Sequence, residues 1–205
     1  MSWRSAIARV LDGRTLSRRV LDRELPGSIP AGQVGTVLDV GGASGIRYRR
    51  LVRCQRYWTV DVQPQNRPSV VGDAHRLPLA DGSVDLVLCL QVLEHCRRPA
   101  DVVREIHRVL APGGRLVLST VLVYELHGSP YDFYRFTEEA LRDLAHDFAE
   151  VKVRTLGNRF VAAYDLTMAR SLALNTLFGR VAYRIGTVPS ASCPCGFILE
   201  SVKSR

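Results

Sequence analysis

Residues 36–45 read T-V-L-D-V-G-G-A-S-G, an apolar run that passes through Asp39 into a cluster of small residues. The β propensity of the run predicts a buried parallel strand, and the small residues predict a turn that leads into a helix. Gly41, Gly42 and Gly45 can adopt positive φ and let a ligand lie against the backbone, while Asp39 supplies an acceptor at the strand's carboxyl end. A small cofactor is the expected occupant, although an ordinary glycine-rich turn of an α/β protein gives a similar pattern.

The chain has 205 residues, of which 46% are hydrophobic, so we expect one sizeable core and a single domain over residues 1–205. Charges interrupt the apolar residues near the amino terminus, and no stretch of eighteen apolar residues follows, so neither a signal peptide nor a transmembrane helix is expected. The five cysteines are scattered and odd in number, which fits reduced thiols better than a disulfide framework. These features favour a cytoplasmic protein.

The net charge of +8 would indicate nucleic-acid binding if it were clustered, but most of it is spread along the chain. Only Arg4–Arg23 and Arg47–Arg56 are locally dense in basic residues, and neither stretch has the interleaved aromatic residues of a base-stacking platform. Solvated basic faces are the simpler interpretation, and nucleic acid is not an expected partner.

Strand-like runs alternate with helical or loop patterns through most of the chain. The predicted strands are Thr36–Val40, Tyr57–Val62, Ser69–Gly72, Val84–Leu90, Arg115–Val121, Glu150–Leu156 and Phe197–Val202. Apolar strands in such a βαβ series predict an α/β, Rossmann-like fold, with a mostly parallel seven-stranded sheet and helices on both faces.

The helices are predicted from apolar spacing and from their end signals. The clearest begins near Pro99 and is stopped by Pro112-Gly113-Gly114, and another is capped by Thr137 and ends near His146. We expect residues 1–35 to form a helical amino-terminal cover, residues 36–122 the cofactor-binding core, and residues 123–205 the acceptor-side elements. The last part includes a helical insertion at about 158–186, read as one broken or two consecutive amphipathic helices, and the last strand.

Several short motifs follow the glycine loop in a fixed order. They are Gly72-Asp73-Ala74, Leu77-Pro78-Leu79, Asp81-Gly82-Ser83-Val84-Asp85, Leu93-Glu94-His95 and Leu110-Ala111-Pro112-Gly113-Gly114. Over about Val37–Leu118 the chain resembles the class I S-adenosylmethionine-dependent methyltransferases, in the group with small-molecule acceptors and the L-E-H and L-x-P-G-G motifs. Ala43 departs from that pattern, since it stands where the family's loop usually has its middle glycine.

The resemblance implies S-adenosylmethionine as cofactor and gives each matching residue a role. Gly41, Gly42, Ala43 and Gly45 would pack against the methionine portion, with Asp39 stabilising the loop and Gln91 beneath the methionine end. Asp61 would hold the ribose hydroxyls, Asp73 and the Ala74 backbone would bind the adenine edge, and Val62 would flank the ring. Each position also has a plain structural alternative, such as a helix cap at Asp61 or a turn at Asp73.

On the acceptor side, the segment H-G-S-P-Y-D-F-Y-R-F-T begins at His127, shortly after the fifth predicted strand. His127 is the candidate general base because an ordinary imidazole can accept a proton at neutral pH, and His95 is its rival. Tyr131, Asp132 and Arg135 are further acceptor-side candidates, and a loop whose charged residues only pin one another is an equally good interpretation.

Other functions remain open at this point. A nicotinamide-dependent oxidoreductase would also use the strand, the glycine loop and the acidic residue, but Ala43 and Ile46 break the G-x-G-x-x-G fingerprint counted from Gly41. A cofactor-binding partner subunit without activity is a second alternative. No metal site is expected, since Cys193 and Cys195 lack further ligands nearby, and the 158–186 helices leave peripheral membrane contact or a homodimer open.

Overall fold

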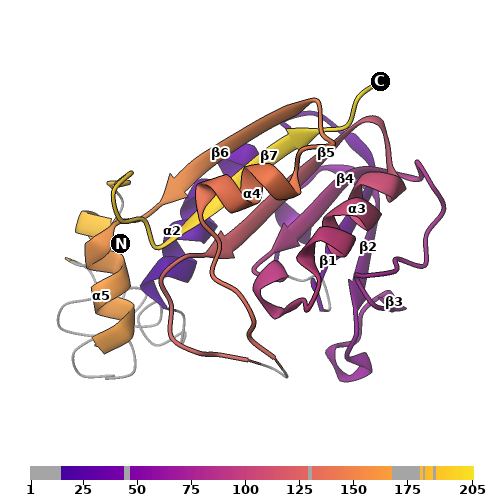
Figure 1. The fold of residues 1–205 in the computed structure, drawn as a ribbon. Coiled ribbons are helices and arrows are strands. Elements are labelled where there is room, and N and C mark those ends of the chain that lie inside the picture. The colour runs from indigo at the N-terminus through magenta and orange to yellow at the C-terminus, as the bar shows by residue number, and fades with distance from the viewer. Residues whose placement is uncertain (1–14, 44–46, 129–130, 168–180, 182, 187) are drawn as a thin grey trace, which may run out of the picture.

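A computed structural model describes residues 15–43, 47–128, 131–167, 181, 183–186 and 188–205. The described strands form one seven-stranded sheet in the order β3-β2-β1-β4-β5-β7-β6 (Figure 1). Their bounds are Val34–Val40 (β1), Cys54–Asp61 (β2), Val70–Val71 (β3), Val84–Leu90 (β4), Leu110–Val121 (β5), Glu150–Leu156 (β6) and Gly196–Val202 (β7). β7 alone runs antiparallel to its two neighbours, so the predicted Rossmann-like, mostly parallel sheet of seven strands is confirmed.

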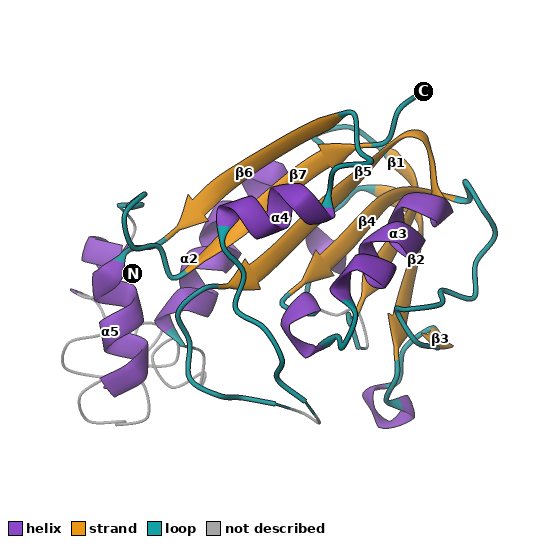
Figure 2. Ribbon diagram, in the orientation of Figure 1, coloured by secondary structure: helices purple, strands orange, loops and turns teal. Residues whose placement is uncertain are grey.

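Helices cover both faces of the sheet, as predicted (Figure 2). On one face lie α3 (Pro99–Val109) and α4 (Glu138–Leu144), and on the other lie α2 (Leu16–Glu24) and α5 (Arg159–Thr167). Alternate residues of each central strand pack against the helices on opposite faces of the sheet. In β4, Val87 and Cys89 pack on the side of α3, and Leu86 and Leu88 pack on the side of α2. The central strands are apolar at nearly every position because they are buried on both sides.

α2 and α5 are held together at their ends. Asp165 of α5 accepts hydrogen bonds from the backbone N–H groups of Leu16 (2.7 Å) and Ser17 (2.8 Å), which are unsatisfied donors in the first turn of α2. Thr15 accepts from the Arg18 N–H at 3.4 Å and forms the N-cap of the same helix. Within the predicted amino-terminal cover of residues 1–35, residues 16–28 are helical, β1 begins at Val34, and residues 1–14 lie outside the described part.

The connections between the first strands are loops with short turns. A helix was expected after the glycine loop, and the described part holds the short 3-10 turn Arg49–Leu51 (η2) there, although residues 44–46 lie outside it; the loop after β2 holds the 3-10 turn Pro64–Asn66 (η3). Between the glycine loop and η2 the structure describes only Arg47 and Tyr48, and Tyr48 is buried in the layer beside α2. The amino-terminal α2 instead covers this side of the sheet through Val20 and Leu21.

α3 ends earlier than the predicted stop at Pro112-Gly113-Gly114. It ends at Val109, and these three residues form the irregular beginning of β5. The ammonium group of Lys203 donates to the carbonyls of His107 and Leu110, each at 2.8 Å, and so satisfies the end of α3. Gly114 accepts from the Lys203 N–H at 2.9 Å, which extends the pairing of β5 with the end of the chain.

Of the helical insertion predicted at about 158–186, the structure describes α5, residue 181 and residues 183–186, all of them helical. The remainder, 168–180 and 182, lies outside the described residues. None of the helices that the structure does describe is long and apolar enough to cross a membrane.

Candidate cofactor and acceptor site

The carboxyl ends of β1, β2 and β4 meet at one edge of the sheet, where ligands bind in open α/β folds. Two loops at this edge have left-handed backbone: Gly41 has φ 69° and Ala43 φ 47° after β1, and Gln91 has φ 60° after β4. Ala43 and Gln91 are two of only three non-glycine residues with positive φ in the described part of the chain. Each costs roughly 1–2 kcal/mol, so strain is concentrated at this edge.

The glycines of the first loop leave no room for side chains of their own. A Cβ atom on Gly41 would lie 2.5 Å from the Cγ2 atom of Val92, and one on Gly42 would overlap the carboxyl group of Asp39. The backbone of this loop is therefore bare, as contact with a ligand requires. Gly45, the third glycine named in the sequence, lies outside the described residues.

Asp39 lies in the interior beneath the loop, with 1% of its surface exposed. Tyr57 of β2 donates its hydroxyl hydrogen to Asp39 Oδ2 at 2.8 Å. Burial raises the pKa of Asp39 to about 6, against a smaller opposing effect of the Tyr57 hydrogen bond. Tyr57 is the one side-chain donor to this carboxylate among the described residues. A buried charge with so little compensation destabilises the fold at neutral pH, so stability alone does not account for Asp39.

Asp39→Asn is expected to stabilise the protein increasingly as pH rises from 4 to 7. The folded pKa of about 6 exceeds the ordinary 3.8, so the unfolded chain releases its proton first and the folded state loses up to about 3 kcal/mol across this interval. Asparagine carries no such penalty and can still accept from Tyr57. Denaturant unfolding at several pH values measures the difference between variant and wild type.

The control for that measurement is Asp101→Asn. Its carboxylate is exposed and its pKa is lowered by hydrogen bonding to Arg98, so this substitution should bring no gain as pH rises. A difference between Asp39→Asn and wild type that stays constant from pH 4 to 7 would contradict the burial of a charged Asp39.

Asp61 and Val62 follow β2 at the same edge. The carboxylate of Asp61 accepts from the Gln63 N–H at 2.9 Å and from Asn66 Nδ2 at 3.0 Å, so it shapes its own turn. Each oxygen retains a lone pair that a ribose hydroxyl could use. Val62 is 56% exposed, and such an apolar surface beside Asp61 suits one face of a flat ring.

Asp73 and Ala74 follow β3. Asp73 accepts from both the backbone N–H of His75 (2.9 Å) and its ring Nδ1 (2.6 Å). Those hydrogen bonds outweigh the effect of burial and lower the pKa of Asp73, which keeps the carboxylate charged. Ala74 is buried beside it. Asp73 is thus a preformed acceptor at the far side of the same edge.

The loop between β5 and α4 hangs below the carboxyl ends of β4 and β5 (Figure 2). Its centre is the ion pair of Asp132 and Arg135, in which Arg135 Nη2 lies 2.8 Å from Asp132 Oδ2. Arg135 also donates to the carbonyl of Glu125 at 3.0 Å, and Asp132 accepts from the His127 N–H at 3.0 Å. Arg135 holds the pKa of Asp132 well below its usual range. These two residues pin the loop, as the structural interpretation of the sequence allowed.

Both candidate histidines lie together. The rings of His95 and His127 meet edge to face, with centroids 4.8 Å apart. His95 Nδ1 lies 2.7 Å from the backbone oxygen of Tyr131, whose side chain is exposed. His127 Nδ1 lies 3.1 Å from the backbone oxygen of Glu125. Burial lowers the pKa of His127, so its imidazole is neutral at physiological pH.

Glu94 is the site residue that sequence reasoning missed. It is fully buried, and its carboxylate oxygens have no hydrogen-bond partner within the described part of the chain. Burial raises its pKa to about 7. Its backbone oxygen accepts from the N–H groups of Phe133 (2.8 Å) and Tyr134 (3.3 Å), so the β5–α4 loop covers it. Its place in the L-E-H motif was noticed, but its burial depends on a loop almost forty residues away.

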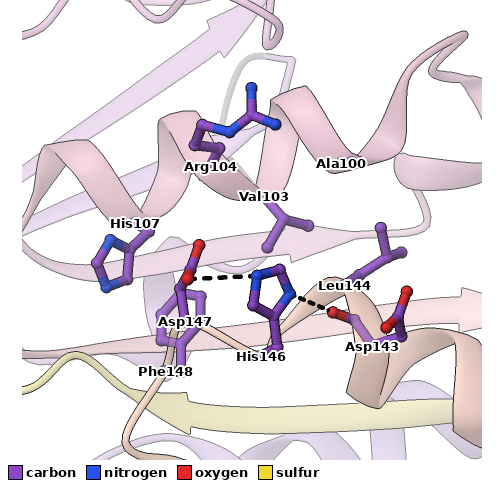
Figure 3. Close-up of a pocket in the computed structure, with 9 residues that line it drawn as sticks. All are labelled: Ala100, Val103, Arg104, His107, Asp143, Leu144, His146, Asp147 and Phe148. Atoms are coloured by element: carbon purple, nitrogen blue, oxygen red, sulfur yellow. Dashed lines mark hydrogen bonds and ion pairs between the residues drawn. The ribbon is translucent and has the colours of Figure 1, made fainter.

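A pocket also lies between α3 and the end of α4 (Figure 3). Its lining includes Val103, His107, Leu144, His146 and Phe148. His146 there is paired locally, to the carbonyl of Asp143 at 2.6 Å and to Asp147 at 3.3 Å. Because none of the predicted site residues lines this pocket, it is separate from the sheet edge.

Residues 38–118 match the family model for a methyltransferase domain. This segment begins within β1 and ends within β5, so it contains the glycine loop, Asp61, Asp73 and Gln91. Among curated relatives, the malonyl-[acyl-carrier protein] O-methyltransferase of Marinomonas sp. is 33% identical over 120 residues, which cover 51% of this chain and 44% of that protein. The chain thus spans less than half the length of that relative.

Solved methyltransferases share the fold. A SAM-dependent methyltransferase from Archaeoglobus fulgidus matches with a TM-score of 0.60 and 16% identity over 92% of this chain and 93% of that one. Phosphoethanolamine N-methyltransferase 2 of Haemonchus contortus, solved with S-adenosyl-L-methionine, matches with a TM-score of 0.61 and 16% identity over 92% of this chain and 53% of that one. At 16% identity these likenesses show that the chain shares its fold with those proteins.

Proposed function

We propose that the protein transfers a methyl group from S-adenosylmethionine to a small-molecule acceptor. The observation that carries the proposal is the position of the methyltransferase match, which covers the loop where Gly41 and Gly42 leave the backbone bare above the buried Asp39. Ala43 in this loop and Gln91 after β4 both have strained, left-handed backbone. A site that retains strain and a buried carboxylate is better explained by ligand binding than by stability.

The residues at the sheet edge fit this cofactor part by part. The backbone of residues 41–43 would lie along the methionine portion, with Asp39 beneath it and Gln91 at its end. Asp61 offers charged acceptors for two ribose hydroxyls, and Val62 offers an apolar face to the adenine. Asp73 would accept from the adenine amino group, with the Ala74 backbone beside it. Gly45 keeps its proposed place in the loop on the sequence resemblance alone.

The cofactor supplies a methyl group already activated by a sulfonium, so transfer to oxygen, nitrogen or carbon needs chiefly in-line placement of the acceptor. A base is needed only where the acceptor must lose a proton. His127 is our candidate for that base, with His95 beside it and Tyr131 at the solvent side. Asp132 and Arg135 hold the loop that positions His127. No covalent intermediate with the protein is required.

The direct test is methyl transfer from isotopically labelled S-adenosylmethionine across a panel of hydroxyl, amine and phenol acceptors. We expect a labelled product with at least one acceptor class and its loss in Gly41→Val. Cofactor binding without any product across the panel would favour the alternative, a partner subunit that binds the cofactor but does not transfer the methyl group. Binding of a nicotinamide dinucleotide in its place would favour an oxidoreductase.

Asp61→Ala is expected to weaken binding of S-adenosylhomocysteine by about 1.5–3 kcal/mol, because charged hydrogen bonds to the ribose would be lost. The matched control is Asn66→Ala, which removes a donor to Asp61 Oδ2 but leaves the carboxylate. Calorimetry should show a large loss for the first variant and a small one for the second. Equal losses would mean that Asp61 acts only by shaping its turn.

A further inference from the structure

Glu94, His95 and His127 form a compact cluster on the acceptor side of the proposed site. One carboxylate oxygen and one nitrogen of each ring all lie within 4.8 Å of one another. Glu94 and His95 belong to the turn η4 (Leu93–His95) that follows β4, and His127 follows β5. Because β4 and β5 are parallel neighbours, their carboxyl ends bring these side chains together.

The hydrogen bonds of the two imidazoles fix which nitrogen holds the lone pair. A carbonyl oxygen can only accept, so each Nδ1 must donate its proton: His95 to the Tyr131 carbonyl at 2.7 Å and His127 to the Glu125 carbonyl at 3.1 Å. Asp132 lies 3.3 Å from the same Nδ1 of His127 and reinforces that tautomer. In neutral rings Nε2 is then an acceptor on both histidines.

Glu94 adds a third acceptor to the cluster. It is fully buried, and neither carboxylate oxygen has a hydrogen-bond donor among the described residues. The nearby guanidinium of Arg135 is engaged by Asp132. The charges of Arg18 and Arg135 act on this carboxylate, but neither residue donates a hydrogen bond to it. A cation held between Glu94 and the two imidazoles would give the buried carboxylate a direct partner.

We propose that Glu94, His95 and His127 bind a divalent transition-metal cation such as Zn²⁺. Two imidazole nitrogens and one carboxylate oxygen are a ligand set that such ions prefer, and each histidine carries the second hydrogen bond to a carbonyl or carboxylate that is typical of metal ligands. Ligands about 2.0–2.2 Å from one ion lie roughly 3.5 Å apart, so small side-chain rotations would close the cluster on it. The site departs from the sequence expectation, which weighed only the cysteines.

Three protein ligands leave at least one coordination position open, as in catalytic rather than structural sites. The cluster adjoins the glycine loop, since Val92 stands between η4 and Gly41. This part rests on the proposed function: the open position would take an acceptor oxygen, and the ion would ease loss of its proton. An acceptor with a hydroxyl beside a second oxygen atom suits such a site best.

The test is titration of the metal-free, tag-free full chain with Zn²⁺ by calorimetry and with Co²⁺ by visible absorption. We expect one equivalent to bind, with d–d bands that show nitrogen and oxygen ligands. His95→Ala, His127→Ala and Glu94→Gln should each weaken metal binding by at least about 100-fold. Loss of an outer hydrogen-bond partner costs up to about 100-fold, and loss of a ligand itself should cost at least as much. Asp132→Asn should weaken metal binding about 10–100-fold, because Asp132 is the outer partner of the His127 ring.

The control is His146→Ala, an exposed histidine paired with Asp143 and Asp147 in the other pocket, which should bind the ion as wild type does (Figure 3). Thermal unfolding establishes whether each variant is folded. If Glu94→Gln does not fold, the two histidine variants still test the metal site. Absence of binding would overturn the proposal. Binding equal in all variants would mark an adventitious ion and would overturn it as well.

The metal site and the proposed function can fail separately. S-adenosylhomocysteine should bind the metal-free protein as tightly as the metal-loaded one, because none of the three ligands belongs to the cofactor loop. Failure of the cofactor to bind would reject the methyltransferase and leave the metal titration unaffected.

Discussion

His127→Ala is expected to lower methyl transfer by about 10²–10⁴-fold while affinity for S-adenosylhomocysteine stays nearly unchanged. The imidazole lies after β5 with its Nδ1 against the Glu125 carbonyl, which leaves Nε2 as the nitrogen that can accept a proton. Either as the proton acceptor or as a ligand of the proposed ion, it acts on the acceptor and not on the cofactor. Single-turnover rates and calorimetry on the same preparation separate the two quantities.

Three further measurements make the His127 result decisive. His146→Ala serves as the control for loss of a histidine and should retain full turnover. A chelator should abolish turnover of wild type if His127 holds a metal ion, and should leave it intact if His127 takes the proton directly. A loss of cofactor affinity as large as the loss of turnover would show that His127 only anchors the loop.

Gly41→Val is expected to abolish cofactor binding. Residue 41 has φ 69°, a backbone conformation that a β-branched residue resists, and the new Cβ would lie 2.5 Å from Val92 Cγ2. Strain alone costs about 1–3 kcal/mol. The added side chain would also fill the bare surface on which the methionine portion is proposed to lie. Titration with S-adenosylhomocysteine measures the effect.

The matched control is Gly82→Val. Gly82 also has positive φ, 63°, but a Cβ there would meet only the Ala111 Cα at 3.9 Å, away from the sheet edge. This variant should be destabilised by a similar backbone strain and yet bind the cofactor normally. If Gly41→Val folds and binds as wild type does, the assignment of the glycine loop is wrong.

The core of the fold was predictable because burial on both faces makes its strands visibly apolar. The predicted bounds of β4 and β6 agree with the structure, and β1 begins only two residues before Thr36. β2 begins earlier than predicted because Gln55 and Arg56 are exposed there and carry no apolar signal. The early end of α3 was not predictable, since it depends on Lys203 reaching the carbonyl of His107 from the end of the chain.

The cofactor edge could be proposed from sequence because its residues follow strand ends in a fixed order. The interactions that complete it are not local in sequence. Tyr57 reaches Asp39 from the neighbouring strand, and Glu94 becomes buried only when the loop carrying Phe133 folds over it. Residue spacing carries no record of either contact. For this reason the cluster of Glu94, His95 and His127 could not be predicted from the sequence.

The central claim is that the sheet edge binds S-adenosylmethionine and its demethylated product. Calorimetric titration of the full chain with S-adenosylhomocysteine, and separately with NADH, tests it most directly. The account predicts saturable binding of one S-adenosylhomocysteine per chain, weakened in Asp61→Ala and lost in Gly41→Val, and no binding of NADH. Saturable binding of NADH, or no binding of S-adenosylhomocysteine by the folded protein, would contradict it.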